Sequence, residues 1–172
     1  MKIRWINPAS PFLIQDRGAP ALGSLYLAAA CRNAGHEVTY LDLTGNKLFA
    51  EIFGLEPNKF LTRLVNLPIT SLGDADIYAL TATSAQYHSC INILNFIKWQ
   101  NPHAKVIIGG SHVSALPQEA LHDGFDAVFV GEADHDLVKF LKEWDFTNNQ
   151  QYQVDCTAPT NLDEIALPAR DL

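Results

Sequence analysis

The chain has 172 residues, which fits one domain with a short additional segment. Apolar residues make up 48% of the chain, enough for a hydrophobic core, which excludes a disordered protein. The formal net charge of -7 argues against nucleic acid and anionic membranes as partners, because both bind through basic patches. The sequence shows no apolar run of about 18 residues and no secretory leader, so we expect a cytoplasmic protein without a membrane partner.

Five short apolar runs predict β-strands, and stretches with helical spacing of apolar residues separate them. The strands are expected at residues 2–6, 37–41, 76–80, 105–108 and 126–130. Helices are expected from Pro20 to Gly35, as two short helices within 48–65, and at residues 87–97, 116–122 and 137–144. Strands that alternate with helices in this way favour parallel pairing with right-handed crossovers.

The alternation predicts an α/β fold, in which a five-stranded parallel sheet of order 2-1-3-4-5 carries helices on both faces. This is the flavodoxin-like (Rossmann-type) architecture. Residues 1–144 are expected to form the domain. From Asp145 the apolar pattern gives way to Asn, Gln, Asp and Thr, so residues 145–172 are interpreted as a linker or tail.

The three cysteines, Cys31, Cys90 and Cys156, are far apart and odd in number, which argues against a disulfide framework. No Cys-x-x-Cys pair offers a zinc or cluster site. Cys31 and Cys90 lie in apolar helical patterns and are expected to be buried as small hydrophobic residues. The sequence also lacks the GxxxxGK[ST] phosphate loop and a GxGxxG after a strand, so the dinucleotide fingerprint is missing.

Ligands of such sheets bind beyond the carboxyl ends of the strands, so the loops there hold the candidate site. The candidates after the third, fourth and fifth strands are Thr81, Thr83, Ser84, Gly109, Gly110, Ser111, His112, Gly131 and Glu132. Two adjacent glycines would let a ligand pass close to the backbone, and the hydroxyls would satisfy its polar atoms. The alternative is structural: Gly109-Gly110 as a turn, Thr81 to Ser84 as a helix N-cap, and Glu132 as a cap of the last helix.

Four segments, in order along the chain, resemble the cobalamin-binding domain of radical S-adenosylmethionine enzymes. They are residues 21–29 (ALGSLYLAA) with 35–38 (GHEV), 107–113 (IIGGSHV), 126–132 (DAVFVGE) and 162–172 (LDEIALPARDL). The last of these looks like the connector that leads into the radical domain in that family.

The resemblance implies that the chain binds cobalamin, with the nucleotide tail passing Gly109-Gly110 and bonding to Thr81, Thr83 or Ser84. S-adenosylmethionine and a [4Fe-4S] cluster would belong to a radical domain, in the same polypeptide or in a partner chain. The complete enzyme would carry out methyl transfer or related radical chemistry, and this chain alone would hold no catalytic residue. The cofactor would supply the chemistry and the protein its orientation.

Two departures from related patterns qualify the resemblance. Cobalamin domains of the methyltransferase type place a histidine under the cobalt through a DxHxxG motif, which is absent here. We therefore expect no protein histidine on the metal, and Gln15 or Arg17 of the first loop could shield that face. The three-cysteine motif that holds the cluster is also absent.

Two other functions remain open at this point. A flavodoxin-like domain could bind a flavin or a nucleotide instead of cobalamin. A non-catalytic regulatory or interaction domain, such as a receiver, shares the topology. A receiver needs an aspartate at the end of the third strand and a lysine near the fifth; the third strand here ends Ala79-Leu80-Thr81-Ala82, which counts against it.

Overall fold

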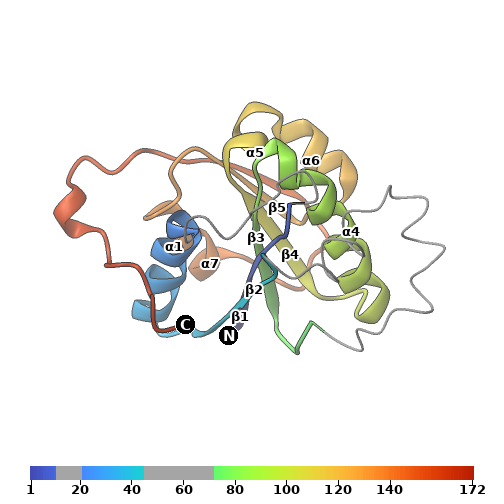
Figure 1. Cartoon of the computed structure of the whole chain (residues 1–172), viewed down its shortest axis with the longest axis horizontal. Coiled ribbons are helices and arrows are strands. Elements are labelled where there is room, and N and C mark those ends of the chain that lie inside the picture. Colours follow the sequence, from blue (N-terminus) through green and yellow to red (C-terminus); the bar gives the residue numbers. More distant parts are fainter. Residues whose placement is uncertain (11–20, 45–71) are drawn as a thin grey trace.

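A computed structural model describes residues 1–10, 21–44 and 72–172, and shows a sheet between two layers of helices (Figure 1). The six strands are β1 (Lys2–Asn7), β2 (Glu37–Asp42), β3 (Ile77–Thr81), β4 (Lys105–Gly109), β5 (Ala127–Val130) and β6 (Tyr152–Asp155). All neighbours pair in parallel, in the order β2-β1-β3-β4-β5-β6. The predicted parallel α/β fold and its order 2-1-3-4-5 are confirmed, with a sixth strand added at the edge.

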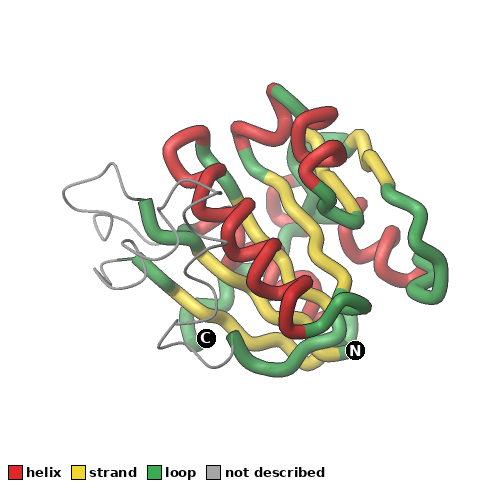
Figure 2. The backbone as a smooth tube through the Cα atoms, turned by 90° about the vertical axis from the view of Figure 1, so that its right-hand side faces the viewer, coloured by secondary structure: helices red, strands yellow, loops and turns green. Residues whose placement is uncertain are grey.

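The helices cover both faces of the sheet, as the sequence predicts (Figures 1 and 2). One face carries α1 (Leu22–Asn33) and α7 (Asp136–Glu143), and the other carries α4 (Ser84–Gln100), α5 (Ser111–Ala115) and α6 (Pro117–Asp123). Along β4, Ile107 packs in the α1 and α7 layer, whereas Val106 and Ile108 pack in the other. Burial on both faces explains why the central strands are continuous apolar runs. None of the helices in the described ranges is long and apolar enough to cross a membrane.

Strand β6 is the main difference from the sequence prediction, because it comes from the stretch interpreted as a linker or tail. Tyr152 and Val154 pack beside the α1 and α7 core, while Gln153 and Asp155 are exposed. An edge strand with two apolar residues among polar ones gives only a weak periodic signal. The parallel pairing of β6 with β5 stabilises the strand, and no local sequence pattern predicts that pairing.

Two helical predictions need separate mention. The helix expected at residues 116–122 is present as α6, and a short helix that the sequence analysis did not expect, α5, precedes it. The two are separate because Pro117 has no N–H to continue α5 and occupies the first turn of α6. The two short helices expected within 48–65 lie outside the described residues, as do Pro20, Gln15 and Arg17.

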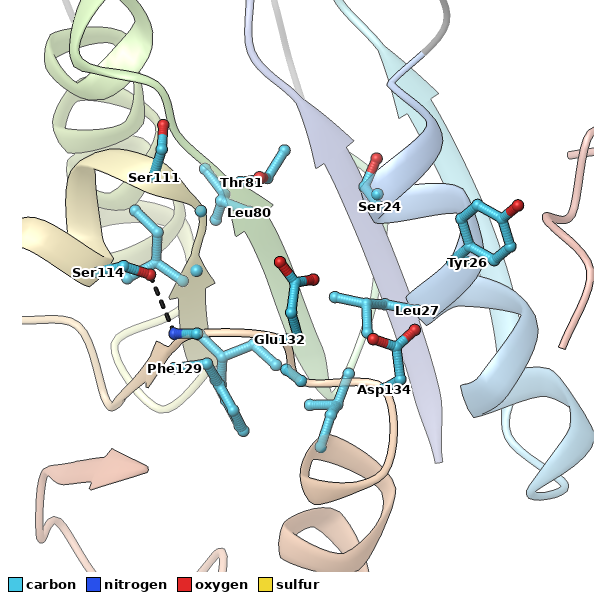
Figure 3. Close-up of a pocket in the computed structure, with 18 of the residues that line it drawn as sticks. Ser24, Tyr26, Leu27, Leu80, Thr81, Ser111, Ser114, Phe129, Glu132 and Asp134 are labelled. Carbon is cyan, nitrogen blue, oxygen red and sulfur yellow. Dashed lines mark hydrogen bonds between the residues drawn. The ribbon is translucent and has the colours of Figure 1, made fainter. Parts of the chain in front are cut away.

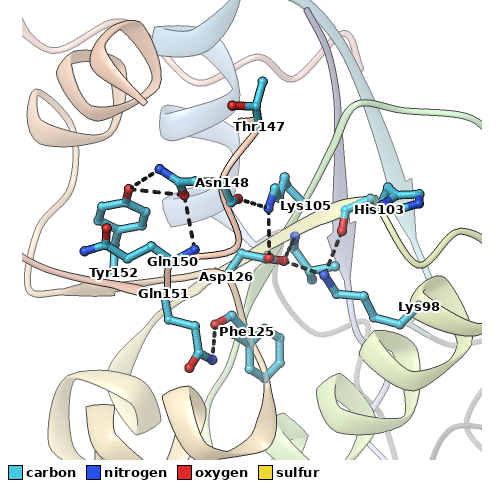
Figure 4. A network of polar contacts seen from close by, with 12 residues as sticks. Lys98, His103, Lys105, Phe125, Asp126, Thr147, Asn148, Gln150, Gln151 and Tyr152 are labelled. Carbon is cyan, nitrogen blue, oxygen red and sulfur yellow. Dashed lines mark hydrogen bonds and ion pairs between the residues drawn. The ribbon is translucent and has the colours of Figure 1, made fainter. Parts of the chain in front are cut away.

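A charged network fixes the amino edge of the sheet, where β4, β5 and α4 meet the loop before β6 (Figure 4). Asp126 accepts hydrogen bonds from the Val106 N–H at 2.8 Å and from the Lys98 ammonium at 2.7 Å. The Lys105 ammonium lies 3.6 Å from the same carboxylate and donates to the Asn148 carbonyl at 2.7 Å. Since the Lys105 side chain is only 8% exposed, its charge depends on this carboxylate for compensation.

We predict that Asp126→Asn lowers the free energy of unfolding by about 2–3 kcal/mol, because it leaves two ammonium groups without their shared counter-charge. The measurement is urea unfolding followed by circular dichroism. Asp163→Asn, at an exposed carboxylate remote from the network, is the matched control and should shift stability by less than about 0.5 kcal/mol. Equal stabilities of the two variants would show that the network does not fix this edge.

Candidate functional site

The loops after β3 and β4 are joined through their backbones at the carboxyl edge of the sheet. The Ala82 N–H donates to the Gly109 carbonyl at 3.0 Å, and the His112 N–H donates to the Ala82 carbonyl at 3.1 Å. Between them Gly110 has φ +104°, and a Cβ atom there would lie 2.6 Å from the Ala82 carbonyl oxygen. Only glycine combines this backbone conformation with so close an approach.

Beside this junction a cleft of about 900 Å³ opens on the α1 and α7 face (Figure 3). Its floor is made by strand side chains of that face, namely Trp5, Ile107 and Phe129. The α1 wall presents Gly23, Ser24 and Leu27, and Leu137 of α7 also lines the cleft. Trp5, Ile107, Phe129 and Leu137 also belong to the hydrophobic core on this side, so the cleft is continuous with the core.

Six of the predicted site residues line this cleft. They come from the ends of β3 and β4 and from the residues that follow β4 and β5, namely Thr81, Gly109, Gly110, Ser111, Gly131 and Glu132. Gly109 has ordinary space around it, because the nearest atom to a Cβ there would be the Phe129 carbonyl oxygen at 3.6 Å. Gln15 and Arg17 lie outside the described residues.

Thr83, Ser84 and His112 do not line the cleft, because their side chains make contacts with the helices of the opposite layer. Thr83 forms a capping box with Gln86 at the start of α4, as its structural interpretation expects. The Ser84 hydroxyl lies 3.1 Å from Nδ1 of His112. The His112 ring stacks on Tyr87 with centroids 3.9 Å apart, and its Nε2 lies 3.2 Å from the Glu119 carboxylate.

Two hydroxyls that the sequence analysis passed over also line the cleft. Ser114 of α5 accepts the Gly131 N–H at 3.0 Å, so its own O–H remains available for donation to a ligand. Ser24 of α1 donates to the Ala21 carbonyl at 2.8 Å and accepts from Tyr40, 2.6 Å away. Burial raises the pKa of Tyr40, which keeps the phenol protonated for this role.

The charged groups of the cleft are both acidic. Glu132 and Asp134, on the loop between β5 and α7, point into the space between the sheet rim and α1 (Figure 3). No lysine, arginine or histidine occurs among the described residues that line it. One buried donor also borders the cleft: the indole N–H of Trp5, which has no hydrogen-bond partner within residues 1–10, 21–44 and 72–172.

Several lining residues were not predicted as part of the site. They are Gly23, Ser24, Leu27, Ser114 and Asp134, with Leu162 and Ile165 from the C-terminal segment. Residues 21–29 carry part of the family resemblance, so they contained a usable signal for the α1 wall. Leu162 and Ile165 also lie in a segment of the resemblance, but that segment is interpreted as a connector. Their position at the cleft depends on the return of the chain to α1, where the Ala169 N–H donates to the Leu25 carbonyl at 3.1 Å.

Protein ligands for a metal or cluster are not assembled at this cleft. All six histidines and all three cysteines of the chain are among the described residues, and none of them lines it. Cys31 and Cys90 are buried on opposite sides of the sheet, as small hydrophobic residues, and burial raises the pKa of the Cys31 thiol to about 12. No group of three His, Cys, Asp or Glu side chains in the described ranges could hold a metal ion.

Comparisons with known proteins agree with this architecture. The family described as B12 binding domain matches residues 18–141. An uncharacterized methyltransferase of Pyrococcus horikoshii is 26% identical over an alignment that covers 100% of this chain and 39% of that protein. The structure of the radical S-adenosylmethionine methyltransferase TsrM from Kitasatospora setae, with tryptophan substrate and a S-adenosylmethionine analogue bound, is similar with a TM-score of 0.53.

The extent of these matches limits what each one shows. The TsrM alignment has 16% identity and covers 83% of this chain and 26% of that chain, so it shows the fold alone. The chain spans 39% of the length of the curated relative.

We predict that Gly110→Ala lowers the free energy of unfolding by about 2–4 kcal/mol, because it combines backbone strain with a clash against Ala82. Gly109→Ala should stay within about 1 kcal/mol of the parent, because its Cβ meets only ordinary contacts. Urea unfolding of both variants measures the difference. Similar losses for both glycines, or a tolerated Gly110→Ala, would contradict the described junction of the two loops.

Proposed function

The chain belongs to the B12-binding domain family, and from this we propose that its cleft binds cobalamin as a module of a larger radical S-adenosylmethionine enzyme. The observation that carries the proposal is the cleft of about 900 Å³ at the carboxyl edge, whose described lining comes mostly from the stretch that matches the family. This volume is at the upper end of about 300–1,000 Å³ for ligand pockets, more than a small metabolite needs.

The chemistry of the cleft suits the nucleotide tail of cobalamin. Its apolar floor of Trp5, Ile107 and Phe129 matches the benzimidazole base. The hydroxyls of Ser111 and Ser114 offer donors for the ribose and the phosphodiester. Gly109 leaves the floor free of a side chain where the tail would enter, and the orphaned indole N–H of Trp5 is a further donor for an acceptor on the ligand.

A flavin mononucleotide or a dinucleotide fits this cleft less well. Their phosphate groups carry two or more negative charges, which Lys and Arg side chains commonly compensate. The described lining has none and instead contributes two carboxylates. Cobalamin carries a single phosphodiester and a periphery of neutral amides, so its electrostatic cost in this cleft is smaller.

The cofactor would supply the methyl-transfer or radical chemistry, while this chain binds and orients it and excludes water from its tail. The S-adenosylmethionine site and the [4Fe-4S] cluster would belong to a partner domain. In support, Cys31 and Cys90 lie on opposite sides of the sheet and cannot converge on one cluster. The methyltransferase names of the two similar proteins favour methyl transfer as the reaction of the complete enzyme.

We predict that the chain binds hydroxocobalamin, and that Gly23→Leu raises the dissociation constant at least about tenfold. Nothing lies within 4 Å of a Cβ at Gly23, so leucine would extend into the cleft without disturbing α1, where it is also the better helix former. Binding is followed by visible absorption during titration.

Asn33→Leu, at the exposed end of the same helix, controls for an added apolar side chain and should bind like the parent. Failure of the parent chain to bind would refute the proposed function, and unchanged binding by Gly23→Leu would place the ligand elsewhere.

We further predict that no protein histidine binds the cobalt, because none of the six histidines lines the cleft. Electron paramagnetic resonance of bound cob(II)alamin should lack nitrogen splitting from an axial imidazole. His112→Ala should leave both the spectrum and the affinity for cobalamin unchanged, since the His112 ring stacks on Tyr87 and contacts Ser84 outside the cleft. Nitrogen splitting that disappears in a histidine variant would identify a protein ligand and contradict this placement.

A further inference from the structure

The pair of carboxylates in the cleft has no function in the protein's own packing. Glu132 is exposed and Asp134 half-buried, and neither takes part in a hydrogen bond or ion pair within the described ranges. The neighbouring acid Asp136 differs, because it accepts the Thr157 N–H at 2.8 Å and so has a structural partner. The two free carboxylates are therefore available to whatever occupies the cleft.

The loop that carries them is held firmly, so their direction is set by the fold. Gly131 begins it with φ +93° and donates its N–H to Ser114. Ala133 is 6% exposed and packs in the core between the two acids, and its carbonyl accepts the Leu137 N–H at 3.0 Å. With the loop anchored at both ends, Glu132 and Asp134 both reach the space between the rim and α1 (Figure 3).

Carboxylates at this place favour a corrin ring whose side chains end in amides over one whose side chains end in free carboxylates. A primary amide donates N–H groups to a carboxylate, and such a charge-assisted hydrogen bond is stronger than a neutral one. A carboxylate on the ligand at the same position would be repelled, and no cation in the described lining offsets that repulsion. Corrinoids differ from one another in amidation, because their acetate and propionate side chains occur either as amides or as free acids.

We infer that Glu132 and Asp134 make the cleft selective for fully amidated corrinoids over forms with free carboxylate side chains. This inference rests on the proposed cobalamin binding and adds the determinant of which corrinoid is accepted. The two residues act as specificity determinants through hydrogen bonding and repulsion, and no covalent step is involved.

The test compares the affinity of the chain for hydroxocobalamin with its affinity for three cobalamin monocarboxylic acids, each with one propionamide hydrolysed to propionate. Near neutral pH, at least one acid should bind the parent chain about tenfold more weakly than hydroxocobalamin. In Glu132→Gln/Asp134→Asn that ratio should fall below about threefold, because the amide side chains no longer repel a carboxylate. Glu143→Gln, at an exposed acid outside the cleft, should keep the ratio of the parent.

A salt series on the parent chain gives a second readout that needs no variant. The ratio should shrink between about 0.05 M and about 0.5 M salt, because screening weakens repulsion between partly exposed charges. Equal binding of all three acids by the parent would overturn the inference, and so would a preference that survives in the double variant. The proposed function would stand in either case, whereas absence of hydroxocobalamin binding would refute the function itself.

Discussion

The close backbone contact between Ala82 and Gly110 determines where everything at the carboxyl edge lies. It holds the loop after β3 against the loop after β4, with a hydrogen bond on each side of the glycine. Thr81 and Ser111 are thereby placed on the cleft side of the junction, while His112 is turned toward the opposite helical layer. A side chain at position 110 would separate the loops, so the wall of the cleft depends on a glycine without a Cβ atom at this position.

Charge is distributed unequally between the two edges of the sheet. At the amino edge, Asp126 is enclosed by two lysines and a backbone N–H, and its charge is used within the protein. At the carboxyl edge, Glu132 and Asp134 lack such partners in the described part of the chain. A carboxylate thus stabilises the fold at the amino edge, whereas two carboxylates at the carboxyl edge remain available to a ligand.

The central strands were predictable because each is buried on two faces and therefore appears as an uninterrupted apolar run, as in 77–80 and 106–108. Strand β6 was missed because only Tyr152 and Val154 are apolar, and because its stability comes from pairing with β5. The family resemblance, carried by segments such as IIGGSHV, is confirmed by the match over residues 18–141.

The sheet topology predicted which loops form the site, but not which of their side chains face the cleft. The rule that ligands bind at the carboxyl edge selects the loops that hold Thr81, Gly109 and Glu132, but it does not say to which side of the sheet each side chain turns. Thr83 and His112 turn away, whereas Asp134 turns inward, and these directions follow from how helices begin after each loop. The capping role of Thr83 was open to prediction as an N-cap, whereas the directions of His112 and Asp134 depend on tertiary packing and leave no mark on local sequence patterns.

The continuity between cleft and core has a consequence for the folding equilibrium once a ligand binds. Trp5, Ile107, Phe129 and Leu137 serve both as core residues and as lining of the cleft, and each is only 1–4% exposed, so a ligand in the cleft would rest directly on the hydrophobic core. A ligand in the cleft would extend this core and shift the folding equilibrium toward the native state by mass action. The stability of the folded chain would therefore rise with the concentration of the proposed cofactor.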